Sequence, residues 1–171
     1  KPHIKKMNHF QSLKTLSYVH VRRILRIWIQ TIIPPAITTA LYFLIFGELI
    51  GSRIGEMPGY EGLTYLEFMV PGLIMLAVIT NSYANVASAF FGAKFQKAIE
   101  EILISPMANW AILLGFIVGG IARGVLVGVV VVLVSLFFTN FGISNVFLTL
   151  FSILLTSTLF SILGLINGVY A

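Results

Sequence analysis

Residues 124–171 read GVLVGVVVVLVSLFFTNFGISNVFLTLFSILLTSTLFSILGLINGVYA, and none of these side chains is charged. Similar charge-free runs cover residues 27–47 and 68–93. A helix rises about 1.5 Å per residue and the hydrocarbon core of a bilayer is roughly 30 Å thick, so the shorter runs can cross it once and the long run twice. Barrel strands would alternate apolar and polar residues, which these runs do not. The sequence therefore predicts an all-α fold, a polytopic bundle of transmembrane helices.

The composition agrees with an integral membrane protein. Hydrophobic residues make up 58% of the 171 residues and charged residues only 10%, which excludes ordinary soluble and disordered proteins. The chain has no cysteine, so disulfides and thiolate metal sites are excluded. Its three histidines, His3, His9 and His20, lie in a basic amino-terminal segment without a companion carboxylate, and we expect no metal site.

Four spans are predicted, and the basic residues set their orientation. The spans cover about residues 28–49, 68–91, 110–138 and 146–170, so residues 1–27 form an amino-terminal segment and residues 28–171 a transmembrane domain. Seven Lys and Arg residues precede the first span and two more follow the second, whereas Arg53 is the only one in the loops of the other side. Because basic loops stay inside, we expect a cytoplasmic amino terminus.

The amino-terminal segment is amphipathic as well as basic. At helical spacing over residues 12–28, Leu13, Leu16 and Ile24 share one face while Arg22 and Arg26 lie opposite. This pattern predicts a helix lying along the cytoplasmic membrane surface, where its cations meet anionic lipid. A simple basic anchor that fixes the topology is the alternative. Nucleic acid is less favoured as a partner, because no groove-reading domain accompanies the charge.

A second amphipathic stretch lies between the second and third spans. Residues 94–104 read KFQKAIEEILI, with apolar Phe95, Ile99 and Ile102 at positions i, i+4 and i+7, and Pro106 ends the pattern. The spacing predicts a short helix outside the membrane, with two acids and two bases on its polar side. Such a helix can dock a soluble partner or rest on the lipid headgroups, and the residues alone leave both open.

Polar side chains inside the predicted spans are candidates for function. Asn81, Asn85 and Ser88 form one stripe of the second span, and Arg123 lies about 6 Å inside the hydrocarbon from the cytoplasmic side. They are candidates for a translocation path. Helix–helix hydrogen bonding by the stripe, and a topological role for a snorkelling Arg123, are the alternatives. The third span also has Gly-x-x-x-Gly spacing, which favours close approach of helices, at Gly115, Gly119, Gly120, Gly124 and Gly128.

Several of these segments together resemble a known family. Pro34-Pro35 in the first span, FMVPGLI at 68–74, FFGAKFQ at 90–96 and IEEIL at 99–103 before Pro106 occur in that order. The whole chain thereby resembles the type-2 permeases of ATP-binding-cassette exporters, and within them bacterial inner-membrane permeases related to drug-resistance and nodulation exporters. The resemblance implies that residues 94–104 are the coupling helix, which contacts a separate ATPase subunit through Phe95, Gln96, Lys97, Glu100 and Glu101.

The resemblance also implies a function. The chain would be the permease subunit of an ATP-driven exporter of the bacterial inner membrane, paired as a homodimer, with an amphipathic or lipid-like substrate suiting its apolar spans. No Gly-x-x-x-x-Gly-Lys-Ser/Thr motif occurs, so we expect no cofactor and no enzyme activity in this chain, and ATP and Mg²⁺ on the partner ATPase. A passive channel or membrane scaffold without an ATPase is the alternative. Family permeases have six spans, so a chain of four that begins with Lys1 is expected to be a fragment.

Overall fold

A computed structural model of the chain describes residues 9–51, 53, 62, 64–104, 108–139 and 145–170. Its regular elements are helices, which confirms the predicted all-α fold. In chain order they are α1 (His9–Arg26), α2 (Trp28–Phe43), the π-helix η1 (Leu44–Gly51), α4 (Tyr65–Phe95), α5 (Ala98–Ile104), α6 (Asn109–Phe138) and α7 (Val146–Tyr170). Among the described residues, four helical stretches are long and apolar enough to cross a bilayer, as predicted: α2 with η1, α4, α6 and α7.

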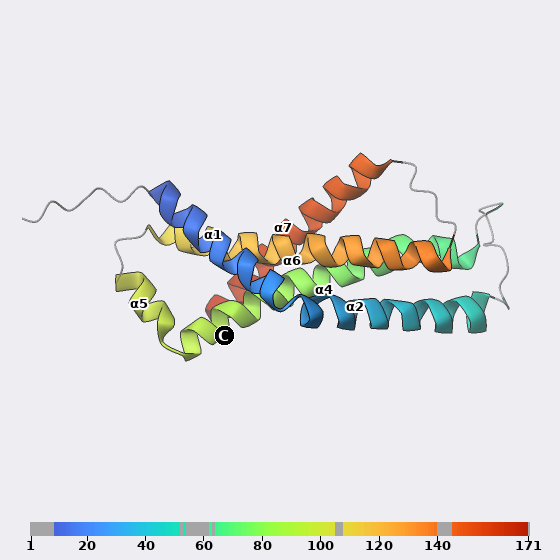
Figure 1. Ribbon diagram of the computed structural model, residues 1–171, viewed down its shortest axis with the longest axis horizontal. Helices are drawn as coiled ribbons and strands as arrows, with labels where there is room; N and C mark the ends of the chain where they lie inside the picture. Colours follow the sequence, from blue (N-terminus) through green and yellow to red (C-terminus); the bar gives the residue numbers. More distant parts are fainter. Residues whose placement is uncertain are drawn as a thin grey trace, which may run out of the picture.

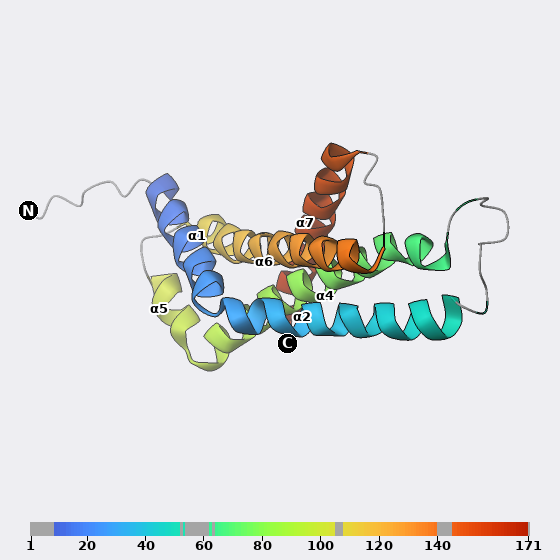
Figure 2. The same ribbon diagram turned by 45° about the vertical axis from the view of Figure 1, so that its right-hand side comes forward.

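The long helices form a bundle around α6. Helices α2, α4 and α6 run along the long axis of the molecule, and α7 crosses them at an angle (Figures 1 and 2). Helix α6 packs against α1, α2, α4 and α7. The short helices α1 and α5 lie at the same end of the bundle (Figure 1). The two segments that the sequence predicts outside the spans therefore share one end of the molecule.

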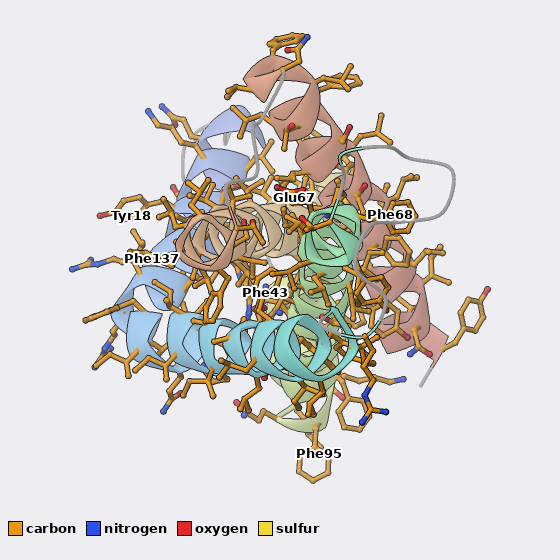
Figure 3. All side chains as sticks on the ribbon, turned by 90° about the vertical axis from the view of Figure 1, so that its right-hand side faces the viewer. Tyr18, Phe43, Glu67, Phe68, Phe95 and Phe137 are labelled. Carbon is orange, nitrogen blue, oxygen red and sulfur yellow. The ribbon has the colours of Figure 1, made fainter. Side chains whose placement is uncertain are left out.

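Apolar side chains fill the bundle and also cover its outside. Phe43 is 1% exposed and packs with Val70, Val78 and Val131 in the centre, whereas Phe137 is 89% exposed. Figure 3 shows Phe43 between the helices and Phe137 pointing away from them. Large exposed apolar side chains of this kind suit contact with lipid.

Three glycines of α6 allow its close packing with α4 and α7. Gly120, Gly124 and Gly128 lie on one face of α6, as the Gly-x-x-x-Gly spacing predicts. A Cβ atom added at Gly124 would collide with Ser82 of α4 and lie 2.9 Å from the Cβ of Ser157 of α7. The missing side chains therefore let both neighbours approach the α6 backbone, and the predicted close approach is confirmed.

The other glycine pair of α6 receives α1. Leu16 covers Gly115, where an added Cβ would lie 3.0 Å from the leucine Cγ, and His20 covers Gly119, where it would lie 3.1 Å from the histidine Cβ. The rings of His20 and Phe116 are 4.6 Å apart between centroids. The amphipathic helix expected over residues 12–28 therefore ends at Arg26 and packs on α6, in addition to any contact with the membrane surface.

The region between α4 and α6 differs from the expected single helix over residues 94–104. Helix α4 ends only at Phe95. A turn then follows at Gln96 and Lys97, and α5 begins at Ala98. The backbone N–H groups of Gln96 and Lys97 bond to the carbonyls of Gly92 and Lys94 at 3.0 and 3.1 Å, which closes α4. Lys97 has φ +56°, in the left-handed region that ends a helix. Phe95 therefore belongs to α4 and not to the apolar face of α5.

Candidate functional site

The end of the bundle that carries α5 exposes apolar surface. Phe95 is 82% exposed and Ile104 is 86% exposed. Figure 3 shows Phe95 pointing away from the helices, and its ring stacks on that of Phe91 at 6.5 Å between centroids. Helix α4 has 31 residues, about 46 Å, so it exceeds the roughly 30 Å hydrocarbon core. The turns around Phe95 are therefore in a position to emerge from a bilayer.

The polar residues predicted for this end follow the exposed phenylalanine in the chain. Gln96, Lys97 and Glu100 are exposed, and the side chain of Glu101 lies outside the described residues. Helix α5 packs mainly against the end of α4. A short helix attached in this way presents both charged and apolar groups to a partner, as an interface requires.

The carboxyl-terminal ends of α4 and α7 meet at the same end. The Lys94 Nζ donates a hydrogen bond to the carbonyl oxygen of Val169 at 3.4 Å. A cation beside the last carbonyls of a helix is favourable, because those oxygens carry partial negative charge. This bond ties the end of α4, from which α5 begins, to α7.

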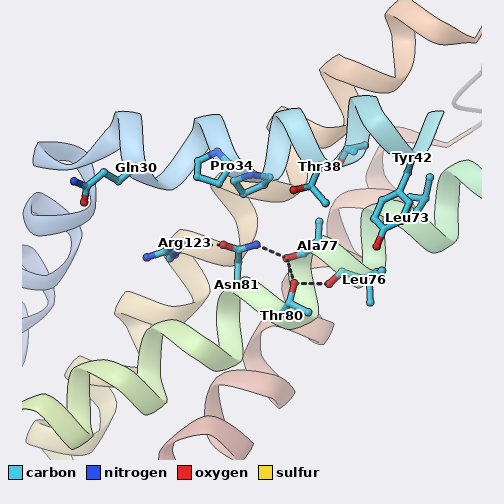
Figure 4. Close-up of a pocket in the computed structure, with 12 residues that line it drawn as sticks. Gln30, Pro34, Thr38, Tyr42, Leu73, Leu76, Ala77, Thr80, Asn81 and Arg123 are labelled. Carbon is cyan, nitrogen blue, oxygen red and sulfur yellow. Dashed lines mark hydrogen bonds between the residues drawn. The ribbon is translucent and has the colours of Figure 1, made fainter. Parts of the chain in front are cut away.

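A second candidate site is a cavity of about 530 Å³ among α2, α4 and α6 (Figure 4). Helix α2 packs much more extensively against α6 than against α4, which leaves the space between α2 and α4 open. The cavity is lined by Gln30, Pro34, Pro35, Thr38, Thr39 and Tyr42 of α2, by Leu73, Leu76, Ala77, Thr80 and Asn81 of α4, and by Arg123 of α6.

Arg123 is held at this cavity by two amides of α4. Its Nη1 donates to Asn85 Oδ1 and its Nη2 to Asn81 Oδ1, each at 3.5 Å. Asn81 is itself oriented by a bond from Nδ2 to the carbonyl of Ala77 at 3.0 Å. The Nε of Arg123 is buried and has no hydrogen-bond partner among the described residues. The guanidinium therefore has two long bonds to neutral groups and spare capacity to donate.

The structure brings together three of the four residues predicted within the spans. Asn81, Asn85 and Arg123 meet between α4 and α6, as described above. Ser88 stays apart from them: its side chain is exposed, and its Oγ donates to the carbonyl of Ala84 at 2.6 Å. Hydrogen bonding of this kind along the same helix is common for serine in apolar spans.

Sequence reasoning missed the polar face of the first span. Gln30, Thr38 and Tyr42 line the cavity opposite Asn81. Gln30, Pro34 and Thr38 recur every four residues, which places them on one helix face, and this spacing was the signal available. Prolines at 34 and 35 also remove two backbone donors from the same stretch of α2.

Packing on α6 affects the titration of His20 in the amino-terminal helix. His20 is half-buried against α6, and its burial, together with the charge of Arg23, lowers its pKa below the ordinary 6.5. Desolvation disfavours the charged form and a neighbouring cation does the same. His20 is therefore neutral at pH 7 when α1 is docked.

These features define a polytopic helical membrane protein that carries two short helices, α1 and α5, at one end and has a polar cavity between its spans. The chain belongs to the ABC-2 type transporter family, whose model matches residues 11–171. The family resemblance derived from the sequence is thus confirmed.

Curated relatives are named as permeases. The inner membrane transport permease YadH of Escherichia coli strain K12 is 51% identical over 163 residues, which cover 95% of this chain and 62% of that protein. Proteins of the same name from Escherichia coli O157:H7 and Shigella flexneri show the same identity and coverage. The chain therefore spans about three fifths of the length of these relatives. No solved structure is significantly similar to it.

Proposed function

We propose that this chain forms part of the permease subunit of an ATP-driven exporter, set in a bacterial inner membrane with its amino terminus in the cytoplasm. The observation that carries the proposal is the end of the bundle with α5, where Phe95 at the end of α4 and Ile104 at the end of α5 are exposed. Membership of the family and the names of the relatives support it. The distribution of basic residues supports the orientation.

In this proposal α5 is the contact for a separate ATPase that binds ATP and Mg²⁺. Phe95 would enter an apolar pocket of that subunit, while Gln96, Lys97, Glu100 and Glu101 would form the polar rim around it. ATP binding would close a pair of ATPase subunits and displace α5 on each of two permease copies. Because α5 follows α4 after a two-residue turn, that displacement would reach the spans directly.

The cavity is the proposed section of the translocation path in this chain. Asn81 and Arg123 line it, Asn85 accepts a hydrogen bond from Arg123, and polar residues of α2 face Asn81 and Arg123 across the open space (Figure 4). Polar groups within apolar spans are costly unless they bond to one another or line an aqueous pathway. Ser88, exposed and bonded within α4, lies outside this section.

The docking role is tested by replacing Phe95 with alanine in the full-length permease, co-expressed with the ATPase of the neighbouring reading frame. A phenylalanine that is exposed in the free permease and becomes buried on binding contributes about 2 kcal/mol to the binding free energy. We therefore expect the affinity for the ATPase to fall roughly thirtyfold. Phe137→Ala is the matched control, since Phe137 is equally exposed but lies at the far end of α6. Reversing the charges with Glu100→Lys and Glu101→Lys should likewise detach or uncouple the ATPase.

Two results would contradict the proposal. Undiminished capture and undiminished ATPase stimulation in the Phe95→Ala and charge-reversed variants would remove α5 from the interface. Transport by the purified full-length permease without any nucleotide-binding partner would favour the passive channel instead.

A further inference from the structure

The cavity contains a positive charge that the described residues leave without a counter-charge. The partners of Arg123 among them are the neutral amides of Asn81 and Asn85, both at 3.5 Å. The two carboxylates whose side chains the structure describes are engaged elsewhere or remote: Glu67 accepts hydrogen bonds from Thr64, and Glu100 is exposed on α5. A cation placed between apolar helices has an unfavourable desolvation free energy unless an anion lies beside it.

The charge is reinforced from the amino-terminal helix. Arg23 lies close enough to Arg123 to interact with it electrostatically. Both are cations, so the interaction is repulsive and raises the positive potential at this end of the cavity. Amides alone do not offset this potential, whereas an anionic group would bond to the guanidinium through charge-assisted hydrogen bonds.

The cavity continues from this cationic end along α2. Gln30 and Tyr42 both line it and are twelve residues apart, a distance of about 18 Å along a helix. Beyond Arg123 and Asn81, its walls include Leu73, Leu76 and the ring of Pro34 (Figure 4). The hydroxyl-bearing residues of the remainder are Thr38, Thr39, Tyr42 and Thr80. A positively charged end and a longer remainder with apolar walls on both α2 and α4 match a molecule with an anionic head and a hydrocarbon tail.

The level of the cationic end supports a membrane-derived ligand. Helix α1 covers Gly115 and Gly119 of α6, and Arg123 follows one turn later, where the chain bends at Ile27 from α1 into α2. If α1 lies in the headgroup region, Arg123 lies just inside the same leaflet. An amphiphile entering sideways between α2 and α4 would bring its head to this depth.

We infer that this cavity binds a single-chain anionic amphiphile, with a phosphate or carboxylate head on Arg123 and the tail along α2, and that such a molecule is the cargo class of the exporter. The identification as cargo rests on the proposed function, whereas the binding site does not. The competing occupant is a carboxylate of another helix, from the rest of the protein or a second copy, which would neutralise Arg123 permanently.

Binding is measured on the detergent-solubilised full-length permease without ATPase, by native mass spectrometry. The probes are palmitoyl lysophosphatidic acid, palmitoyl lysophosphatidylcholine, which has the same tail but no net charge, and inorganic phosphate, which has the charge but no tail. We expect the lyso acid to bind about tenfold more tightly than the choline lipid, as one charge-assisted contact allows. Phosphate alone should not compete at equal concentration.

Two variants locate the effect at the cavity. Arg123→Gln removes the charge and should make the two lipids bind equally. Asn81→Asp is nearly isosteric and places a carboxylate at the position of the amide oxygen, 3.5 Å from Nη2. It should abolish the preference while keeping the fold, and it carries the test if Arg123→Gln does not fold. Arg26→Gln, which removes a cation of α1 outside the cavity, should keep the full preference.

Three contrary outcomes of the lipid-binding measurements would each overturn the inferred binding site. Equal binding of both lipids to the unaltered protein would mean that Arg123 is already neutralised by another helix. A preference that survives Asn81→Asp, or that disappears in Arg26→Gln, would place the lipid on the surface of α1. Competition by phosphate as strong as that by the lyso acid would reduce the site to an anion site. Failure of ATPase capture with intact lipid binding would refute the exporter and leave the binding site standing.

Discussion

Replacing Gly124 with alanine is the most direct test of how this bundle is held together. The substitution adds one methyl group at the middle of α6, between α4 and α7. That methyl group would collide with Ser82 and lie 2.9 Å from the Cβ of Ser157. Contacts this short cannot form, and neither neighbour is the end of a long flexible side chain, so both helices have to move outward.

The expected loss follows from two opposing effects. Alanine is a better helix former than glycine by about 1 kcal/mol, which favours the variant. Overpacking costs about 1–3 kcal/mol at a well-packed contact, and here it applies on two helices at once. The outward movement also separates the neighbours of Gly120 and Gly128 on the same face. We expect a net destabilisation of about 2 kcal/mol.

The assay is equilibrium unfolding of the purified protein in mixed micelles. The loss of packing between the helices is the signal that monitors unfolding. Gly72→Ala in α4 is the matched control, because an added Cβ there meets nothing within 4 Å. It should gain up to about 1 kcal/mol from helix propensity. If Gly124→Ala is as stable as the unaltered protein, or if Gly72→Ala is equally damaging, close packing at the α6 glycines does not stabilise the bundle.

Three further predictions concern the α4–α5 turn, the docking of α1 and the start of α4. Lys97→Gly should stabilise the α4–α5 turn by about 1 kcal/mol, because glycine adopts the positive φ without strain, whereas Lys97→Val should destabilise it and weaken ATPase capture. Because burial against α6 lowers the pKa of His20, the undocked histidine gains its proton at a higher pH than the docked one; docking of α1 should therefore weaken as the pH falls below about 6.5, and His20→Phe should abolish this pH dependence in a protease-protection assay. Glu67→Ala should remove the bonds from Thr64 and fray the start of α4, which hydrogen exchange at its first turn would detect; unchanged exchange would show that the cap is not needed.

Span positions were predictable because hydropathy and length determine them almost alone. The predicted first span and α2 both begin at Trp28, and the predicted fourth span and α7 both cover residues 146–170. The second span was expected from Phe68 to Phe91, but α4 is longer at both ends. Its extra residues include Glu67 and Lys94, charges that a helix tolerates and a hydropathy pattern excludes. Residue pattern thus locates a span without fixing where its helix ends.

Contacts between the spans were less predictable, because uniform hydropathy does not fix the rotation of a helix about its axis. The stripe of Asn81 and Asn85 was recognised, yet nothing in the sequence shows that it faces Arg123 and not lipid. Gln30 and Thr38 were missed for the same reason, since isolated polar residues of an apolar span acquire meaning only when a facing helix is known. The turn at Lys97 was missed because lysine carries no preference for positive φ.

Ser82 packs tightly against Gly124, so α4 can rotate about this contact as a pivot. Phe95 lies thirteen residues from Ser82 on one side and Tyr65 lies seventeen on the other, about 20 and 25 Å along the helix. Pushing Phe95 sideways by about 2 Å would rock the helix by roughly 6° and swing Tyr65 the opposite way by about 2.5 Å. Asn81, next to the pivot, would hardly travel. Such rocking would change the separation of α4 and α2 where Leu73 and Tyr42 line the cavity, while the hydrogen bond between Asn81 and Arg123 is kept.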